Sequence, residues 1–249
     1  MKVAQLLKEL SGSEGSGAST TELARAGGVS RSTAHRILNT MQRHGLSDRD
    51  AESGRWMLGP EVFLLGMACA PRYDIRAVSE SIVRRLAAES GESAFLSVRR
   101  GDETVCLLRE DGSFPLRSHV LHEGLRLPLG VASAGMAILA FMGDPERADY
   151  LERTDLVHQF GETHGRALLE ARLEQTRADG YSIHPGLLVE GSWGMAAAVF
   201  DAAGAPVAAL SLTGVEHRFR ADRQKVLGPM LLRAAHAVTD AIAPRAASR

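Results

Sequence analysis

The sequence predicts an α+β protein in which a small helical N-terminal domain is joined by one helix to a larger domain built on an antiparallel sheet. Three observations support this class. Short helical patterns fill the first 45 residues and are followed by an apparent hairpin. An apolar helical segment spans residues 60–70. From residue 75 onward, helical patterns alternate with short apolar runs joined by turns, and 249 residues suffice for two modest domains.

Two short helices are expected before residue 30. The first has apolar residues at helical spacing, namely Val3, Leu6, Leu7 and Leu10. A connection rich in Gly and Ser follows over residues 11–18. The second helix begins at residues 19–22, which have the spacing of a capping box, and it ends at the glycine pair 27–28.

The third helix is expected over residues 31–43, with Ser30 as its N-cap and Gly45 just beyond its end. Its core face consists of Ala34, Ile37, Leu38 and Met41. The opposite face carries only hydrogen-bonding or cationic side chains, namely Ser32, Arg36, Asn39 and Arg43, flanked by Arg31 and His35. A helix without carboxylates and with three arginines is suited to phosphate, although an ordinary solvated helix has the same pattern.

A hairpin is expected directly after this helix. Residues 46–50 and 55–58 flank a turn at 51–54 that ends in glycine. A short helix, a tight turn, a cationic helix and a hairpin together predict a winged helix-turn-helix, the architecture of many DNA-binding domains.

The segment at residues 60–70 is predicted to be a helix with Pro60 in its first turn. Apolar side chains cover most of its circumference, so we expect a partner chain to bury it. Packing on its own domain is the alternative. A dimer also suits a winged helix that must contact two half-sites.

The second domain is expected to alternate helices and strands. Helices are predicted over residues 75–90, 136–142, 167–178 and 223–242. Strands are predicted over residues 94–100, 104–109, 114–121, 194–200 and 206–213.

The order and spacing of these motifs resemble the IclR (isocitrate lyase regulator) family of bacterial transcription factors over nearly the whole chain. The matching segments are residues 21–24, 32–38, 45–46, 54–59, 127–129, 134–137, 179–181, 196–201 and 210–214. The resemblance implies a winged helix-turn-helix DNA-binding domain at 1–58, a linker helix at 59–72, and a GAF-like effector-binding domain at 73–249.

Net charge is only −1, so DNA contact must come from the local basic cluster. Candidates for base edges are Arg31, Ser32, His35 and Arg36, with Arg36 favoured for a guanine. Thr21, Arg43, Arg49 and Arg55 are expected at phosphates, with Arg55 also placing the wing at the minor groove. Ser30, Thr33 and Asn39 complete the expected DNA-binding set.

An effector site is expected at residues 130–136, where a loop of small residues opens a helix and leaves backbone N–H groups for a carboxylate. Ser133 either caps that helix or contacts the ligand. The resemblance implies that the rest of the pocket is formed by Leu121, Ala134, Gly135, His184, Gly194, Ser211 and Thr213. His184 stands where the family usually has an acid and Gly194 where cysteine is common, which favours a larger carboxylate such as an aromatic acid.

No enzyme motif is present: the sequence lacks HExxH, a P-loop, a dinucleotide fingerprint and G-x-S-x-G spacing around Ser133 or over 190–194. We therefore expect no catalytic function, cofactor or metal. Cys69 and Cys106 are far apart in apolar runs, which predicts no disulfide and a cytoplasmic location. No run reaches the length of a membrane helix.

These observations predict a ligand-responsive transcription factor that binds a near-palindromic operator as a dimer or tetramer and is controlled by a small carboxylate. A small-molecule-binding module whose helix-turn-helix contacts proteins is the alternative.

Overall fold

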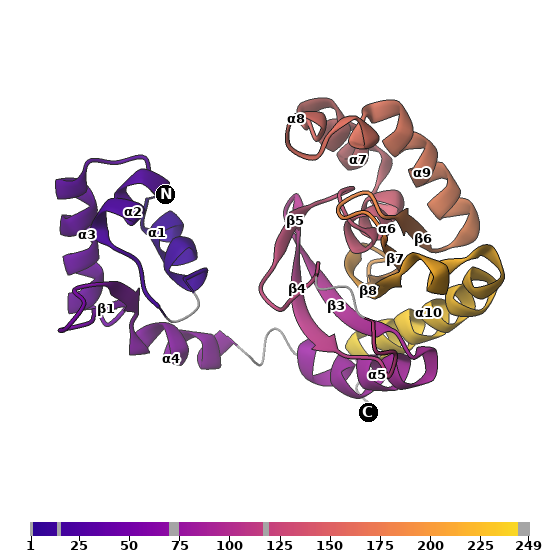
Figure 1. Cartoon of the computed structure of the whole chain (residues 1–249), viewed down its shortest axis with the longest axis horizontal. Coiled ribbons are helices and arrows are strands. Elements are labelled where there is room, and N and C mark those ends of the chain that lie inside the picture. The colour runs from indigo at the N-terminus through magenta and orange to yellow at the C-terminus, as the bar shows by residue number, and fades with distance from the viewer. Residues whose placement is uncertain (1, 14–15, 70–74, 117–119, 244–249) are drawn as a thin grey trace. The chain divides into compact units, whose positions relative to one another are not determined.

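The computed structural model describes residues 2–13, 16–69, 75–116 and 120–243. The chain divides into two compact units, Met1–Tyr73 and Asp74–Arg249. Figure 1 labels their elements. The first unit contains α1 (Lys2–Ser11), α2 (Thr20–Ala26), α3 (Arg31–Arg43), β1 (Ser47–Arg49), β2 (Trp56–Leu58) and α4 (Pro60–Cys69).

The predicted caps define both helices of the helix-turn-helix. The Ser19 side chain accepts from the backbone of Glu22 at 3.2 Å, and the Glu22 carboxylate accepts from the Ser19 backbone at 2.7 Å, which confirms the capping box. Ser30 accepts from the Thr33 backbone at 3.2 Å as the N-cap of α3. The chain leaves α3 through Gly45, whose φ of +69° favours glycine.

The first helix fixes the turn between α2 and α3. Lys2 donates from Nζ to the carbonyl of Gly27, and Gln5 donates from Nε2 to that of Ala26, both at 2.7 Å. These side chains satisfy carbonyls that the end of α2 leaves unpaired. The core of the unit is then closed by Leu6, Leu10, Leu23, Leu38, Met41 and Trp56.

The wing and the linker helix are also confirmed as elements. Strands β1 and β2 pair antiparallel, with Ser47 opposite Leu58 and Arg49 opposite Trp56. Helix α4 begins against the wing, because the Glu61 backbone donates to the Gly45 carbonyl at 3.0 Å.

The second unit is built on one antiparallel sheet with strand order β5-β4-β3-β8-β7-β6. Its strands are β3 (Ser93–Arg100), β4 (Glu103–Glu110), β5 (Arg126–Pro128), β6 (Ser182–Pro185), β7 (Ser192–Phe200) and β8 (Pro206–Val215). Its α-helices are α5 (Ile75–Ser90), α6 (Ser133–Phe141), α7 (Asp144–Arg153), α8 (Val157–Phe160), α9 (Arg166–Asp179) and α10 (Ala221–Ile242). Two 3₁₀ turns are η2 (Glu162–His164) and η3 (Glu216–Phe219).

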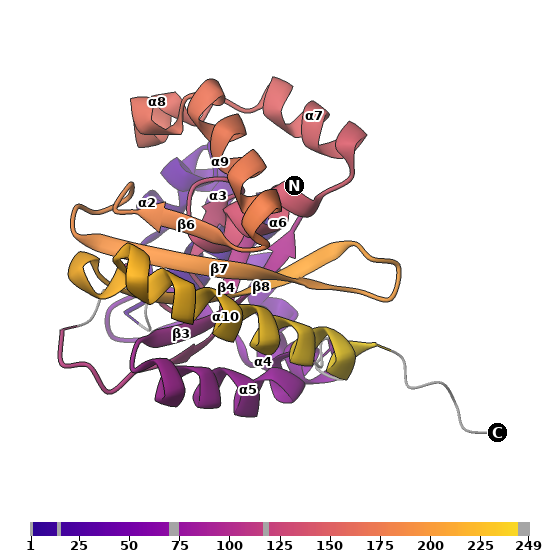
Figure 2. The same cartoon turned by 90° about the vertical axis from the view of Figure 1, so that its right-hand side faces the viewer.

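Each face of the sheet packs against its own helices (Figure 2). Helices α5 and α10 cover one face, where Leu96, Met195, Leu210 and Leu212 are fully buried. Helix α6 packs against the other face, which presents Ala196, Ala198 and Ala209, and α9 packs on α6. Small side chains on this face let α6 approach closely, so α6 is buried from Ser133 to Ala140.

One predicted strand is wrong where it can be checked. The described residues of 114–121 form no strand, and residues 117–119 lie outside the described part. The edge strand is instead β5, which pairs with β4 through Leu127 opposite Thr104. Sequence patterns also gave no signal for α7, α8 or β6. No helix in the described part of the chain is long and apolar enough to cross a membrane.

Candidate functional sites: the α3 surface and the pocket beside α6

The outward face of α3 presents arginines that no carboxylate in the described part of their domain pairs with. Arg31, Ser32, His35 and Arg36 are all exposed. Within the described residues, the guanidinium groups of Arg31 and Arg36 make no hydrogen bond and no ion pair. Free guanidinium groups on an exposed helix are available to phosphate oxygens or to the acceptor edge of guanine.

The other polar side chains of α3 are partly occupied by one another. The Ser30 hydroxyl lies 3.0 Å from that of Ser32 and 2.9 Å from that of Thr33. Asn39 Nδ2 lies 3.1 Å from Nδ1 of His35. When Nδ1 accepts this hydrogen bond, the neutral ring carries its hydrogen on Nε2, so His35 has a donor left for a base or phosphate.

Trp56 holds the wing against both helices and was not singled out by sequence. Its side chain is 0% exposed, and Nε1 donates to the Thr20 hydroxyl at 3.0 Å. The His35 ring lies edge-on at 6.1 Å between centroids, and the Arg49 guanidinium lies 5.5 Å from the indole centroid. Backbone hydrogen bonds of 2.8 Å in both directions pair Trp56 with Ala18. The side chains of His35 and Arg49, both predicted to contact DNA, therefore pack against one buried indole.

The arginines predicted to contact phosphate differ in how many hydrogen bonds they already make within their own domain. Arg55 donates to the carbonyls of Ser16 and Gly17, the shortest contact being 2.8 Å, and its NH2 lies 3.2 Å from Glu22. Arg49 donates from Nε to the Gly54 carbonyl at 3.1 Å. Among the residues that the structure describes, Arg43 donates only to the Thr40 hydroxyl, at 3.2 Å. Arg55 therefore fastens the wing to the start of α2, a role that sequence did not predict.

The pocket beside α6 begins at the N-terminus of that helix. The N-cap position is Ala132, with φ −121° and ψ 169°, and no side chain caps the helix. Ser133 is thus not the cap, which removes one of its two expected roles. The first backbone N–H groups of α6 are left to other acceptors, as the anion-site prediction requires.

The strands opposite this helix end carry a glycine and two residues whose hydroxyl groups make no hydrogen bond in the described structure. Gly194 pairs with His184 on one side and Thr213 on the other. A Cβ at Gly194 would lie 2.9 Å from the Ser133 hydroxyl, so only glycine fits here without a shift. In the described structure, the buried hydroxyls of Ser211 and Thr213 have no hydrogen-bond partner. Such groups are costly unless a ligand or water satisfies them.

His184 is a buried, neutral member of this site. It is 5% exposed, and its Nε2 lies 2.7 Å from the carbonyl of Val131, to which it donates. Burial lowers the pKa of His184 to about 4. The imidazole donor expected in the pocket is therefore present, but it is engaged by the loop that precedes α6.

The pocket brings together five of the eight predicted effector residues, Leu121, Ser133, His184, Gly194 and Thr213. Val120, Ala132, Leu188, Ser192 and Trp193 complete its lining. Ala134, Gly135 and Ser211 are buried and do not line it. Its free volume is about 20 Å³, room for roughly one water molecule. An organic effector therefore requires movement of the lining residues.

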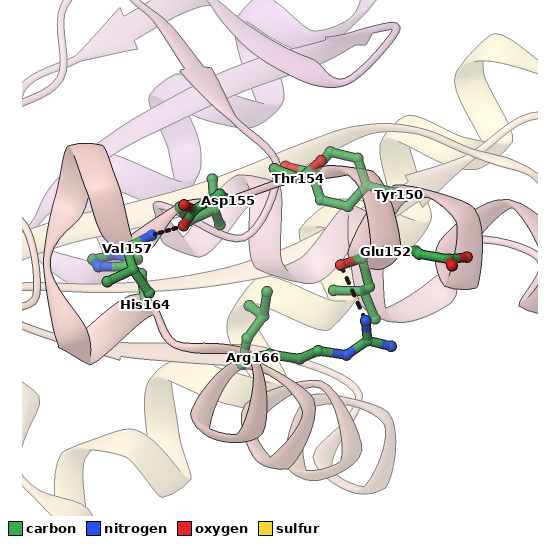
Figure 3. Close-up of a pocket in the computed structure, with 10 residues that line it drawn as sticks. Tyr150, Glu152, Thr154, Asp155, Val157, His164 and Arg166 are labelled. Carbon is green, nitrogen blue, oxygen red and sulfur yellow. Dashed lines mark hydrogen bonds between the residues drawn. The ribbon is translucent and has the colours of Figure 1, made fainter.

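A larger pocket that sequence did not predict lies between α7, α8 and α9 (Figure 3). Its free volume is about 260 Å³, and its apolar wall includes Leu156, Val157 and Leu169. Arg166 donates to the Leu151 carbonyl at 3.3 Å, and Asp155 accepts from the Val157 backbone at 3.0 Å. The pocket also reaches His164, whose ring lies beside Val157 in Figure 3.

Comparison with known proteins finds family models that match both parts of the chain. The family model described as "Bacterial transcriptional regulator IclR C-terminal" matches residues 67–240, and the "IclR helix-turn-helix domain" model matches residues 1–51. The chain is 32% identical over 240 residues to the transcriptional repressor IclR of Escherichia coli (strain K12), covering 94% of this chain and 86% of that protein.

Solved structures share the fold over almost the whole chain. An IclR transcriptional regulator from Alicyclobacillus acidocaldarius has a TM-score of 0.82 at 24% identity, covering 96% of both chains. An IclR homologue from Microbacterium hydrocarbonoxydans, complexed with 4-hydroxybenzoate, has a TM-score of 0.78 at 22% identity, covering 97% of both chains.

A winged helix-turn-helix followed by a second domain built on an antiparallel sheet is the architecture of a DNA-binding transcriptional regulator. The chain belongs to the IclR family of bacterial transcriptional regulators. It is a regulator and not an enzyme, like the relatives it matches.

Proposed function

We propose that this regulator acts in the cytoplasm and binds a near-palindromic operator as a dimer, or as a tetramer of two dimers, under the control of a small carboxylate. The observation that carries the proposal is the exposed face of α3, where Arg31 and Arg36 have no partner in the described structure. A helix presenting two such cations at its first turns is arranged to enter a major groove.

We assign the residues of this face to two roles. Arg31, Ser32, His35 and Arg36 contact base edges, with Arg36 at a guanine. Thr21, Arg43, Arg49 and Arg55 lie at phosphates and set the position of the domain on the duplex. Because Arg55 is already held by Gly17 and Glu22, its contribution is to keep the wing in place while its exposed edge faces the DNA backbone.

The linker helix supports the proposed assembly. On α4, Phe63 is 69% exposed, Leu64 55% and Met67 59%. Apolar side chains left in water along one helix are typical of a protein interface. Burial of α4 against the same helix of a second protomer would pair two α3 helices for two half-sites, and would place α4 where effector binding can alter their spacing.

The effector class follows from the chemistry of the pocket beside α6. The uncapped N-terminus of α6 and the unsatisfied hydroxyl of Thr213 supply donors for a carboxylate. We extend the proposal to an aromatic acid, over a two- or three-carbon acid, because Gly194 and His184 stand where the family commonly has a cysteine and an acid; the lining residues must move to admit it. A homologue of the same fold is complexed with 4-hydroxybenzoate, which is such an acid.

A gel-shift experiment with the DNA upstream of the protein's own gene tests this function. We expect a discrete complex containing two or four protomers by analytical ultracentrifugation, and a change in affinity when an aromatic carboxylate is added. The effect of a ligand on DNA affinity equals its difference in affinity for the two states, so a factor of about 5 to 150 is the typical range. Glyoxylate and pyruvate serve as short-chain controls.

Two other results would contradict the proposed function. Specific binding that responds to glyoxylate or pyruvate and ignores aromatic acids would contradict the proposed effector class. Absence of any DNA complex, with retained ligand binding, would favour a module whose helix-turn-helix contacts proteins.

A further inference from the structure

A second buried histidine lies behind the effector pocket. His164 ends η2 and is 2% exposed. Its Nε2 lies 3.3 Å from the carbonyl of Val131, the same carbonyl that lies 2.7 Å from Nε2 of His184. Because a carbonyl oxygen only accepts, the 2.7 Å contact requires a hydrogen on Nε2 of His184, whereas His164 lies between two carbonyls, its Nδ1 being 3.0 Å from that of Phe160. The two imidazoles therefore lie against one carbonyl, with ring centroids 6.3 Å apart.

Helix α9 adds a permanent cation to this pair. Arg172 donates from its NH1 to the carbonyl of Thr163, next to His164, at 2.7 Å. Its side chain is partly buried, and desolvation lowers its pKa. Arg166 on the same helix is different, because Glu170 pairs with it at 2.9 Å.

No negative charge balances this group within the described structure. Neither Arg172 nor His164 nor His184 has a carboxylate within ion-pair distance there. Partly buried cations without partners are uncommon, because charges taken out of water are normally paired. The arrangement therefore produces a positive potential next to the effector pocket.

The positive potential reaches the pocket itself. Burial is the main cause of the lowered pKa of His184, and the neighbouring His164 and Arg172 lower it further. A potential that disfavours an added proton at His184 stabilises an anion at the same place. Water screens this potential only in part, since His184 and His164 are almost fully buried while Arg172 is partly exposed.

We propose that the positive charge of Arg172, held behind the effector pocket at the carbonyl next to His164, makes the pocket prefer a carboxylate to an uncharged ligand of the same shape, although neither Arg172 nor His164 lines it. Arg172 supplies the charge, and His164 connects η2 to the loop before α6 through the Val131 carbonyl. His164 also borders the larger α7–α9 pocket (Figure 3). This inference rests on the proposed carboxylate effector.

The experiment compares a carboxylate with its amide. Calorimetry on the full-length protein measures 4-hydroxybenzoate and 4-hydroxybenzamide binding to the wild type, Arg172→Gln and Arg172→Lys. We expect Arg172→Gln to weaken the acid by about threefold to tenfold while the amide is unchanged, as a charge acting over several ångströms predicts. Arg172→Lys retains the preference. Arg166→Gln is the matched control, because Glu170 already neutralises Arg166, and it should change neither affinity.

A second readout needs no ligand. The pH titration of the His184 Cε1–H signal, followed by NMR, should move to higher pH in Arg172→Gln, because one source of positive potential is removed. His164→Gln, which removes the imidazole while keeping a hydrogen-bonding amide, should also reduce the preference for the acid.

The outcomes separate this inference from the function on which it rests. A wild type that binds neither acid nor amide overturns the aromatic-acid effector and the inference together. A wild type that prefers the acid, with an Arg172→Gln variant that keeps the same preference and the same His184 titration, overturns the inference alone. Equal loss of acid and amide in Arg172→Gln shows a structural role and also overturns it.

Discussion

Replacing Trp56 by alanine is expected to destabilise the DNA-binding unit by about 3–5 kcal/mol, the range measured for truncating buried large aromatic residues. The indole is fully buried, and it contacts Thr20, His35 and Arg49 from three different elements. A loss of this size approaches the whole stability of a small domain. Hydrogen exchange should therefore rise in peptides from residues 1–60 and stay unchanged in the strands of the second unit.

The matched control is Trp56→Phe. It keeps an aromatic ring in the core and removes the hydrogen bond from Nε1 to Thr20, so it should cost about 1 kcal/mol. If Trp56→Ala left exchange in residues 1–60 as slow as in the wild type, the indole would not be the centre of this unit.

The second large effect is a loss of stability in mild acid caused by His184. An unfolded histidine has its ordinary pKa of about 6.5. In the folded protein, burial lowers the pKa of His184 to about 4. The unfolded state therefore binds the proton more readily, so stability is intact above pH 6.5 and falls as the pH drops toward 4. The full loss is about 3 kcal/mol.

Urea denaturation at a series of pH values checks this. We expect His184→Gln to show a shallower fall in unfolding free energy between pH 6.5 and pH 4 than the wild type. The comparison concerns the slope, so a variant that is less stable throughout still gives an answer. His158→Gln, at an exposed position on α8, should keep the wild-type slope. Identical slopes for His184→Gln and the wild type would contradict a buried neutral imidazole.

The DNA-binding unit follows from local signals. The capping box at Ser19, the N-cap at Ser30 and the turn at Gly45 each act within a few residues, so their effects can be derived from the sequence alone. Sequence reasoning missed the roles of Trp56 and Arg55, because their partners at positions 16–22 lie more than thirty residues earlier in the chain.

The effector domain was predicted less completely, because more of its contacts join residues that are far apart in the sequence. Helix α5 and strands β3 and β4 have clear periodicity, whereas β6 contains only four residues, too few for a pattern. The resemblance placed His184 and Thr213 at one site, and the structure brings them to one pocket. The position of Ser133 inside α6, and the Arg172 and His164 contacts behind the pocket, depend on long-range packing that periodicity does not contain.

Sequence recognition by α3 can be tested because the winged helix-turn-helix contains arginines of two kinds. Arg36 is free to contact bases, whereas Arg55 is bound to its own domain. Binding of the wild type, Arg36→Ala and Arg55→Ala to a selected operator and its single-base variants is the most direct measurement. We expect Arg36→Ala to cost about 1–3 kcal/mol and to lose discrimination at one base pair, while Arg55→Ala weakens binding to all sequences alike. Uniform loss of affinity in both variants would contradict sequence recognition by α3.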